Sequence, residues 1–134
     1  MFVERTGNYI RIYIAGTYED QKSLRIYKDK LWAMGHEVVS SWLDEVKCPP
    51  GMDKPTFMKK LAFKDCCEVE AADLVICVTG PKISEGKAIE FGFALRSHQR
   101  KQLWIVGPKR SCFHELADRV FEDWKGCLDA IPNN

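Results

Sequence analysis

The stretch from Leu74 to Leu95 constrains the fold more than any other part of the sequence. An apolar run ending at Val78 is followed by a Thr-Gly-Pro turn and then, from Ala88, by apolar residues at helical spacing. We expect a strand, a loop and a helix buried on most of its surface. Glu90 is the only charged residue in that helix, and a carboxylate in packed surroundings is costly unless it is paired, neutralised or placed in a cleft.

Strand and helix patterns alternate along the whole chain. β-Branched and aromatic runs predict strands at 9–15, 37–42, 74–78, 102–106 and 119–121, and helical spacing predicts helices at 19–34, 57–71, 88–95 and 122–131. Residues 1–8 are expected to form a loose lead-in. Such alternation produces a parallel sheet with right-handed crossovers. We expect one α/β domain over residues 1–134, a three-layer Rossmann-like or flavodoxin-like fold with about five parallel strands and helices on both faces.

The charge balance disfavours nucleic-acid polymers and membrane surfaces as partners. Lysines and arginines number 20 and acidic residues 19, so the formal net charge is +1, without the positive field that such partners require. The first residues are too polar for a signal peptide, and no apolar run approaches the length of a membrane span. A cytoplasmic protein is expected.

Six cysteines occur, but their positions disfavour disulfides and metal sites. Cys77 lies inside a strand pattern, Cys66 and Cys67 are adjacent in a helix pattern, and there is no Cys-x-x-Cys pair. We therefore expect reduced, mostly buried thiols and no bound metal. His36 follows a helix-ending glycine and His98 falls in a last helical turn, so both are interpreted as structural.

The usual cofactor motifs are absent. The first strand ends in Ala15-Gly16-Thr17-Tyr18-Glu19, without the Gly-x-Gly-x-x-Gly pattern of dinucleotide-binding folds. Neither a Gly-x-x-x-x-Gly-Lys-Ser/Thr phosphate loop nor a Gly-x-Ser-x-Gly elbow is present. No cofactor is expected, although a flavodoxin-like binding module without catalysis remains an open alternative.

Several polar residues are predicted near one edge of the sheet. Tyr13 and Thr17 flank the end of the first strand, Asp65 precedes the third strand on a helix, and Ser84 and Glu90 follow that strand. In a parallel sheet the strand-end members open on one edge and can converge on a small molecule. A carboxylate nucleophile with a second acid is what attack on an anomeric carbon needs.

Each of these residues also has a structural interpretation. Ser84 would cap the following helix, Glu90 would pair with Lys87 one turn away, Asp65 would be a solvated helix residue, and Tyr13 would belong to the core.

A long loop, Leu43 to Lys54, follows the second strand, and loops of this length are often functional. Trp42 at its entrance either stacks on a base or belongs to the core.

Taken together, the motifs resemble the nucleoside 2-deoxyribosyltransferase superfamily, and the resemblance covers nearly the whole chain. It is closest to the small single-domain members found in phage and bacterial genomes. The segments that carry it are Ile12–Gly16, Asp65 with Asp73 eight residues later, Gly86–Ala94, Ser41-Trp42-Leu43, Val106-Gly107-Pro108 and Phe113-His114.

The resemblance implies a role for several residues. Glu90 would be the nucleophile that forms a glycosyl ester at C1′ of the sugar, and Tyr13 would hold that carboxylate or the sugar. Asp65 would contact the base and help to protonate it as it leaves. Gly86 would allow the backbone to approach the sugar closely. Gly16 and Thr17, in the first loop, are assigned with Trp42 to the substrate site.

One departure from the family pattern bears on the substrate. Transferases of the superfamily usually carry an aspartate six residues before the nucleophile, where this chain has Ser84. Serine there resembles the branch that hydrolyses (deoxy)nucleoside 5′-monophosphates, because an aspartate would repel the phosphate and a hydroxyl at a helix amino terminus would attract it. Lys87 adds a cation, and Lys109, Arg110 and Ser111 could complete the phosphate site, from the same or a neighbouring subunit.

We therefore expect an enzyme that cleaves the N-glycosidic bond of a nucleoside 5′-monophosphate. The alternatives are base exchange between free nucleosides and a non-catalytic nucleotide-binding module. Because relatives build their sites across a subunit interface, the resemblance also implies a homodimer or a higher homo-oligomer.

Overall fold

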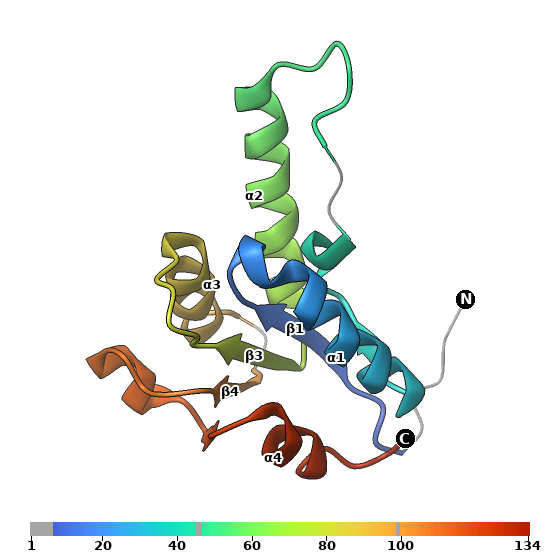
Figure 1. Cartoon of the computed structure of the whole chain (residues 1–134), viewed down its shortest axis with the longest axis vertical. Coiled ribbons are helices and arrows are strands. Elements are labelled where there is room, and N and C mark those ends of the chain that lie inside the picture. Colours follow the sequence, from blue (N-terminus) through green and yellow to red (C-terminus); the bar gives the residue numbers. More distant parts are fainter. Residues whose placement is uncertain (1–6, 45–46, 99) are drawn as a thin grey trace.

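The computed structural model describes residues 7–44, 47–98 and 100–134. Most of the expected lead-in and residues 45–46 of the expected long loop lie outside the described residues. Within them, one sheet of five parallel strands has the order β2-β1-β3-β4-β5 (Figure 1). The strands are β1 (Arg11–Ala15), β2 (Glu37–Val38), β3 (Leu74–Val78), β4 (Gln102–Val106) and β5 (Arg119–Phe121).

Helices cover both faces of the sheet, as expected. They are α1 (Gln21–Ala33), α2 (Lys54–Ala71), α3 (Glu85–Leu95) and α4 (Trp124–Asp129), with short 3-10 helices η1 (Tyr18–Asp20), η2 (Ser41–Asp44) and η3 (Cys112–Leu116). On one face α1 meets α4 through the stacked rings of Tyr27 and Trp124, whose centroids are 4.4 Å apart. On the other face α2 packs against α3. The predicted three-layer α/β architecture is confirmed.

The strand order places the crossover reversal between β1 and β3, where α/β proteins usually bind ligands. These two strands form the centre of the core. Residues 12–15 of β1 and 74–77 of β3 are all buried, because a parallel sheet covered on both faces leaves neither side of a central strand in water. The phenol of Tyr13 is the only polar side chain among these eight residues apart from the thiol of Cys77.

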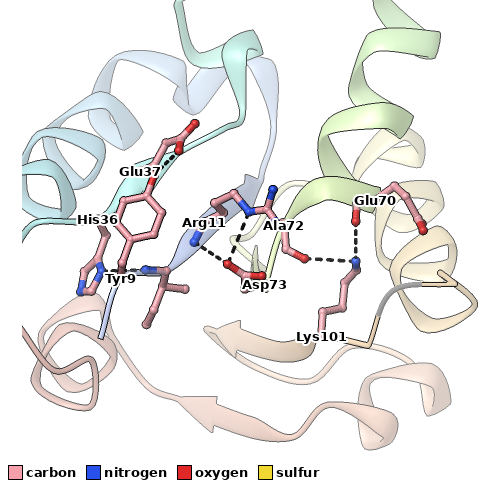
Figure 2. Close-up of polar contacts among 9 residues, drawn as sticks. Tyr9, Arg11, His36, Glu37, Glu70, Ala72, Asp73 and Lys101 are labelled. Carbon is pink, nitrogen blue, oxygen red and sulfur yellow. Dashed lines mark hydrogen bonds and ion pairs between the residues drawn. The ribbon is translucent and has the colours of Figure 1, made fainter. Parts of the chain in front are cut away.

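The amino-terminal edge of the sheet is fastened by polar contacts (Figure 2). The Arg11 amide donates to Asp73 Oδ2 at 2.9 Å, and the Lys101 ammonium donates to the carbonyls of Glu70 and Ala72 at 3.0 and 3.1 Å. The ammonium thus satisfies carbonyls at the carboxyl end of α2, where a helix has acceptors without intrahelical partners. These contacts join the start of β1 to Asp73, just before β3, and join Lys101, just before β4, to the end of α2.

The second strand is shorter than the predicted 37–42. Only Glu37 and Val38 are in β2, and the predicted strand end forms η2 instead. Side chains explain the change: the Ser40 hydroxyl accepts from the Ile14 amide at 3.1 Å, and the Trp42 indole donates to the Ile14 carbonyl at 2.7 Å. Short polar side chains often compete with backbone pairing in this way.

Helix starts also differ from the prediction. The predicted helix 19–34 is divided into η1 and α1, and α2 begins at Lys54 rather than residue 57. Asp53 caps α2 by accepting from the Thr56 amide at 3.0 Å, and Pro55 lies in its first turn. The last helix is limited to Trp124–Asp129 because Asp123 caps it, accepting from the Gly126 amide at 2.9 Å.

The expectation that α3 is buried on most of its surface is wrong for the single chain. Phe91 and Ala94 are buried, but Ile89 is 66% exposed and Phe93 40% exposed. Apolar composition alone does not separate a helix buried by its own chain from one that presents an apolar face.

All six cysteines are free, and the expectation of mostly buried thiols is wrong. Only Cys77 and Cys127 are buried. His36 is structural as predicted, since its ring accepts from the Ile10 amide at 3.2 Å and contacts the Pro132 carbonyl at 2.7 Å. His98 lies beyond the end of α3 rather than in its last turn. No helix in the described ranges is long and apolar enough to cross a membrane.

Candidate active site

Three carboxylates and a phenol meet above β1, where α2 packs against α3. Tyr13 rises from β1, Asp65 and Glu68 come from α2, and Glu90 comes from α3. Each of the three acids acts electrostatically on the phenol, and Asp65 and Glu68 also act on Glu90. The structure thus brings the three predicted catalytic residues together, and it adds Glu68.

The electrostatic environment of Glu90 favours its protonated form. Burial raises its pKa to about 7, hydrogen bonding from Tyr13 opposes the rise, and the negative charges of Asp65 and Glu68 add to it. A carboxyl group with a pKa near neutrality can exchange its charge at physiological pH, which is typical of catalytic acids and nucleophiles. The alternative structural interpretation, a pairing of Glu90 with Lys87, is not found within the described residues, where the Lys87 ammonium donates to the Lys82 carbonyl at 3.3 Å.

Tyr13 is a neutral hydrogen-bond donor in this site. Its pKa is raised first by burial and then by the charges of Glu90 and Asp65. The phenol therefore keeps its proton over the whole physiological range. It can direct that proton towards Glu90 or towards a bound hydroxyl group.

Buried polar atoms without partners gather around this site. Within the described residues, the Tyr13 hydroxyl, Ser41 Oγ and Glu90 Oε2 meet no partner at normal hydrogen-bond geometry. The phenol is nevertheless near enough to Glu90 to lower the pKa of its carboxyl. Native proteins rarely leave such atoms unpaired. The Tyr13 hydroxyl and Glu90 Oε2 can therefore each form a hydrogen bond with a polar molecule that reaches them.

A second, basic feature lies at the amino terminus of α3. Ser84 caps this helix, its Oγ accepting from the Lys87 amide at 3.3 Å, so the predicted capping role is confirmed. Beside the cap is a cavity of about 250 Å³. Its lining includes Thr79, Lys82, Ser84, Lys87, Arg110, Ser111 and His114.

The lining joins residues from two distant parts of the sequence. Ser84 and Lys87 belong to the start of α3, and Arg110 and Ser111 to the loop after β4. The His114 ring holds this loop, because its Nδ1 accepts from the Arg110 amide at 2.9 Å. Lys109 does not line the cavity and pairs with Glu115 at 3.0 Å. One chain therefore supplies both the serine and the basic residues of the expected phosphate site.

Both the acidic and the basic features involve α3. Glu90 faces α2, whereas Ala88 faces η3, where the Phe91 and His114 rings lie 5.2 Å apart. Figure 1 shows α3 between the lower end of α2 and η3. Glu90 does not line the basic cavity, but both Glu90 and Lys87 act electrostatically on Cys77 beneath the helix.

The remaining predicted site residues have structural contacts. A Cβ at Gly16 would lie 2.6 Å from Leu24 Cδ1, so this glycine allows close packing. Thr17 is buried and donates to Asp20 Oδ2 at 2.5 Å. Trp42 is 8% exposed and bonded to Ile14, which favours its core interpretation. Around Gly86 there is space, since an added Cβ would meet only Ser84 Oγ, at 3.8 Å.

One residue near the site, Glu68, is not singled out by the sequence. Glu68 lies one helical turn after Asp65, and its Oε1 accepts from the Ser41 amide at 3.2 Å. The three-residue spacing from Asp65 is the signal that could have revealed it, because residues three apart share a helix face.

No three His, Cys, Asp or Glu side chains within the described ranges are grouped to hold a metal ion.

Comparisons with known proteins agree with this geometry at the level of the fold. No family model and no curated protein matches the sequence. The 2-deoxyribosyltransferase from Bacillus psychrosaccharolyticus superposes with a TM-score of 0.71 at 19% identity, over 92% of this chain and 97% of that one. The CMP N-glycosidase BcmB from Clostridium botulinum superposes with a TM-score of 0.58 at 20% identity, over 89% and 95%. The fold implied by the sequence resemblance is confirmed.

Proposed function

We propose that this protein cleaves the N-glycosidic bond of a (deoxy)nucleoside 5′-monophosphate, with Glu90 as the nucleophile. The observation that carries the proposal is the half-buried Glu90 carboxyl, with a pKa of about 7, beside Tyr13 and Asp65. The two solved structures of the same fold support this class of reaction, since one is a 2-deoxyribosyltransferase and the other a CMP N-glycosidase.

In the first step the Glu90 carboxylate attacks C1′ of the sugar. The bond from C1′ to the base nitrogen breaks, and its electron pair leaves with the base. Asp65, which takes up the proton that Glu90 releases on ionising, supplies it to the departing base, so that a neutral base and a glycosyl ester of Glu90 are formed. The Tyr13 phenol, held neutral by its surroundings, orients the attacking carboxylate.

In the second step water replaces the enzyme at C1′. The Asp65 carboxylate, left without its proton, takes one from the water as the oxygen attacks, and the ester bond to Glu90 breaks with its electrons returning to the carboxylate. Sugar phosphate is released and both acids regain their starting states. This use of one group first as acid and then as base is the usual logic of retaining glycosidases.

The basic cavity supports a phosphorylated substrate. Lys87 and Arg110 contribute positive side chains to its lining, Lys82 lies there paired with Glu19, and Ser84 and Ser111 contribute hydroxyls. The amino terminus of α3 adds a dipole that favours an anion. Lys87 is only 7% exposed, and a buried cation is stabilised by an anionic partner.

Base exchange between free nucleosides is the second candidate. The structural similarity to a 2-deoxyribosyltransferase favours it, and its chemistry differs only in that a second base, rather than water, attacks the glycosyl ester. A non-catalytic nucleotide-binding module is the third candidate.

We also propose a homodimer or higher homo-oligomer. An apolar surface of α3 and η3 supports it, with Ile89 66%, Phe113 63% and Leu116 61% exposed. Contiguous apolar surface of this kind is typical of subunit contacts.

Chromatography of reaction mixtures tests the proposal. Each nucleoside and each 5′-monophosphate is incubated with the protein, with and without a second free base. Base release from monophosphates alone, abolished in Glu90→Gln with the variant still folded, is the expected result. Exchange between free nucleosides would favour the transferase. Nucleotide binding without any product, or full turnover by Glu90→Gln, would contradict the proposed mechanism.

A further inference from the structure

Glu68 occupies a position that links three elements of the candidate site. It shares a face of α2 with Asp65, it is half-buried, and its Oε1 accepts from the Ser41 amide at 3.2 Å. Ser41 begins η2 and precedes Trp42, whose indole is bonded to the Ile14 carbonyl of β1 at 2.7 Å. Glu68 is therefore connected to β1 through Ser41, to which it is hydrogen-bonded, and through Trp42, the next residue, which is hydrogen-bonded to Ile14.

Glu68 is also one of few charged groups that surround the nucleophile. Titratable groups that act on Glu90, or on which it acts, come from α2, β1 and β3, three of the elements packed against α3. They are Tyr13 of β1, Asp65, Cys66 and Glu68 of α2, and Cys77 of β3, with Lys87 on α3 itself acting on Cys77. Among them, Asp65 and Glu68 are the acids that bring further negative charge to Glu90.

We propose that Glu68 is a positioning residue for the reaction at Glu90: it ties η2 to α2 through the Ser41 amide and adds negative charge to the surroundings in which the Glu90 carboxyl acts. The catalytic part of this inference rests on the proposed function. The structural part does not rest on it: this part consists of the hydrogen bond from the Ser41 amide to Glu68 and the effect of the Glu68 charge on the Glu90 carboxyl.

Two effects of this negative charge oppose one another. A negative neighbour disfavours ionisation of Glu90, so the nucleophile gains its charge at higher pH. The same negative charge favours the positive charge that develops at C1′ as the glycosidic bond breaks, because fixed charges near developing opposite charge lower the barrier. Removal of the Glu68 charge should therefore move activity to lower pH and reduce its maximum. A residue with a purely structural role would not produce this pair of changes.

Three variants separate the charge from the hydrogen bond. Glu68→Gln removes the charge and keeps an oxygen that can accept from the Ser41 amide, whereas Glu68→Ala removes both. Glu70→Gln is the matched control, since it is the same substitution on the same helix. Glu70 accepts from the Ser97 hydroxyl and is not among the groups that shift Glu90.

The first measurement is an NMR titration of the ¹³C-labelled Glu90 carboxyl, assigned with Glu90→Gln. We expect the midpoint to fall by roughly 0.5 to 1 pH unit in Glu68→Gln, the size typical of a lost like-charge neighbour, and to remain unchanged in Glu70→Gln. The second is hydrogen exchange of the Ser41 amide. Its protection should persist in Glu68→Gln and fall in Glu68→Ala.

The pH dependence of kcat/KM completes the test. Its acidic limb should follow the NMR midpoint, and the maximum should fall about tenfold in Glu68→Gln, as for loss of a modest electrostatic contribution to the transition state. An unchanged Glu90 midpoint in Glu68→Gln would overturn the inference, as would an equal shift in Glu70→Gln. The expected titration shifts without turnover in any protein would support the effect of the Glu68 charge and overturn the proposed function, so the two failures can be told apart.

Discussion

The Trp42 indole donates a hydrogen bond of 2.7 Å to the carbonyl of Ile14, the residue that follows Tyr13 on β1. The Ser40 hydroxyl accepts from the Ile14 amide. The two hydrogen bonds together hold the β1 backbone next to Tyr13, the partner of Glu90. The aromatic ring thus contributes to the core and to the placement of Tyr13.

Replacement of this indole should therefore affect stability first. Trp42→Phe loses a buried hydrogen bond and leaves part of the ring volume unfilled, so we expect a loss of roughly 1–3 kcal/mol in the free energy of unfolding. Urea denaturation measures it. Trp32→Phe is the control, because Trp32 is 69% exposed and surface substitutions usually change stability by less than about 0.5 kcal/mol. Equal losses in the two variants would contradict the core role of Trp42.

The Ser84 cap allows a test of substrate class with little structural disturbance. Aspartate caps helices as well as serine does, so Ser84→Asp should keep the hydrogen bond from the Lys87 amide and the fold. Its charge would repel a phosphate dianion in the basic cavity. We expect kcat/KM for the monophosphate to fall at least about tenfold, the effect of roughly 1.4 kcal/mol, with little change for the matching free nucleoside. A parallel loss for both substrates would argue against a phosphate at Ser84.

The central strands could be predicted because buried parallel strands are continuously apolar in sequence. Leu74–Val78 and Gln102–Val106 appear in the structure with the predicted bounds, since continuous apolar runs are the pattern of buried parallel strands. The end of β2 could not be predicted in this way. Its replacement by η2 depends on side-chain bonds from Ser40 and Trp42 to Ile14, a strand residue far away in the sequence.

The residues of the candidate site likewise include some that could be predicted from the sequence and some that could not. Tyr13 and Glu90 could be predicted to approach one another because the chain order fixes where each strand and the helix after it lie. Glu68 could not be distinguished from a solvated helix carboxylate, since only the packing of α2 against α3 and η2 gives it polar partners in the interior. The exposure of Ile89 could not be predicted either, because an apolar sequence does not say whether the rest of its own chain covers it.

The pKa of Glu90 predicts how stability changes with pH. Its folded value of about 7 lies above the ordinary 4.5, so the folded protein holds a proton that the unfolded chain releases. The free energy of unfolding should therefore fall as pH rises from about 4.5 to about 7 and change little through this group above that range. The glutamine in Glu90→Gln does not ionise, so this variant should not show that fall in the free energy of unfolding. Near pH 8 it should exceed the wild type by roughly 2–3 kcal/mol, with a smaller difference near pH 5.

Urea denaturation of both proteins at several pH values measures this difference. Glu85→Gln is a suitable control, since Glu85 is exposed in the first turn of the same helix. A constant gap between Glu90→Gln and the wild type across the pH range would show that the Glu90 carboxyl is not perturbed, and would remove the main support for its role as nucleophile.

Gly107, at the end of β4, holds the loop that carries Arg110 and Ser111. Its φ is +116°, and an added Cβ would lie 2.6 Å from Thr79 Oγ1 and 2.7 Å from the Thr79 carbonyl oxygen. Because the contact includes backbone and the dihedral disfavours other residues, Gly107→Ala should cost about 2 kcal/mol or more. Gly92→Ala is the matched control: nothing lies within 4 Å of the added Cβ, and alanine within α3 should stabilise by roughly 0.5–1 kcal/mol. Thermal denaturation should show a lower Tm for Gly107→Ala and a higher Tm for Gly92→Ala. An unchanged Tm in Gly107→Ala would contradict the close contact between residue 107 and Thr79.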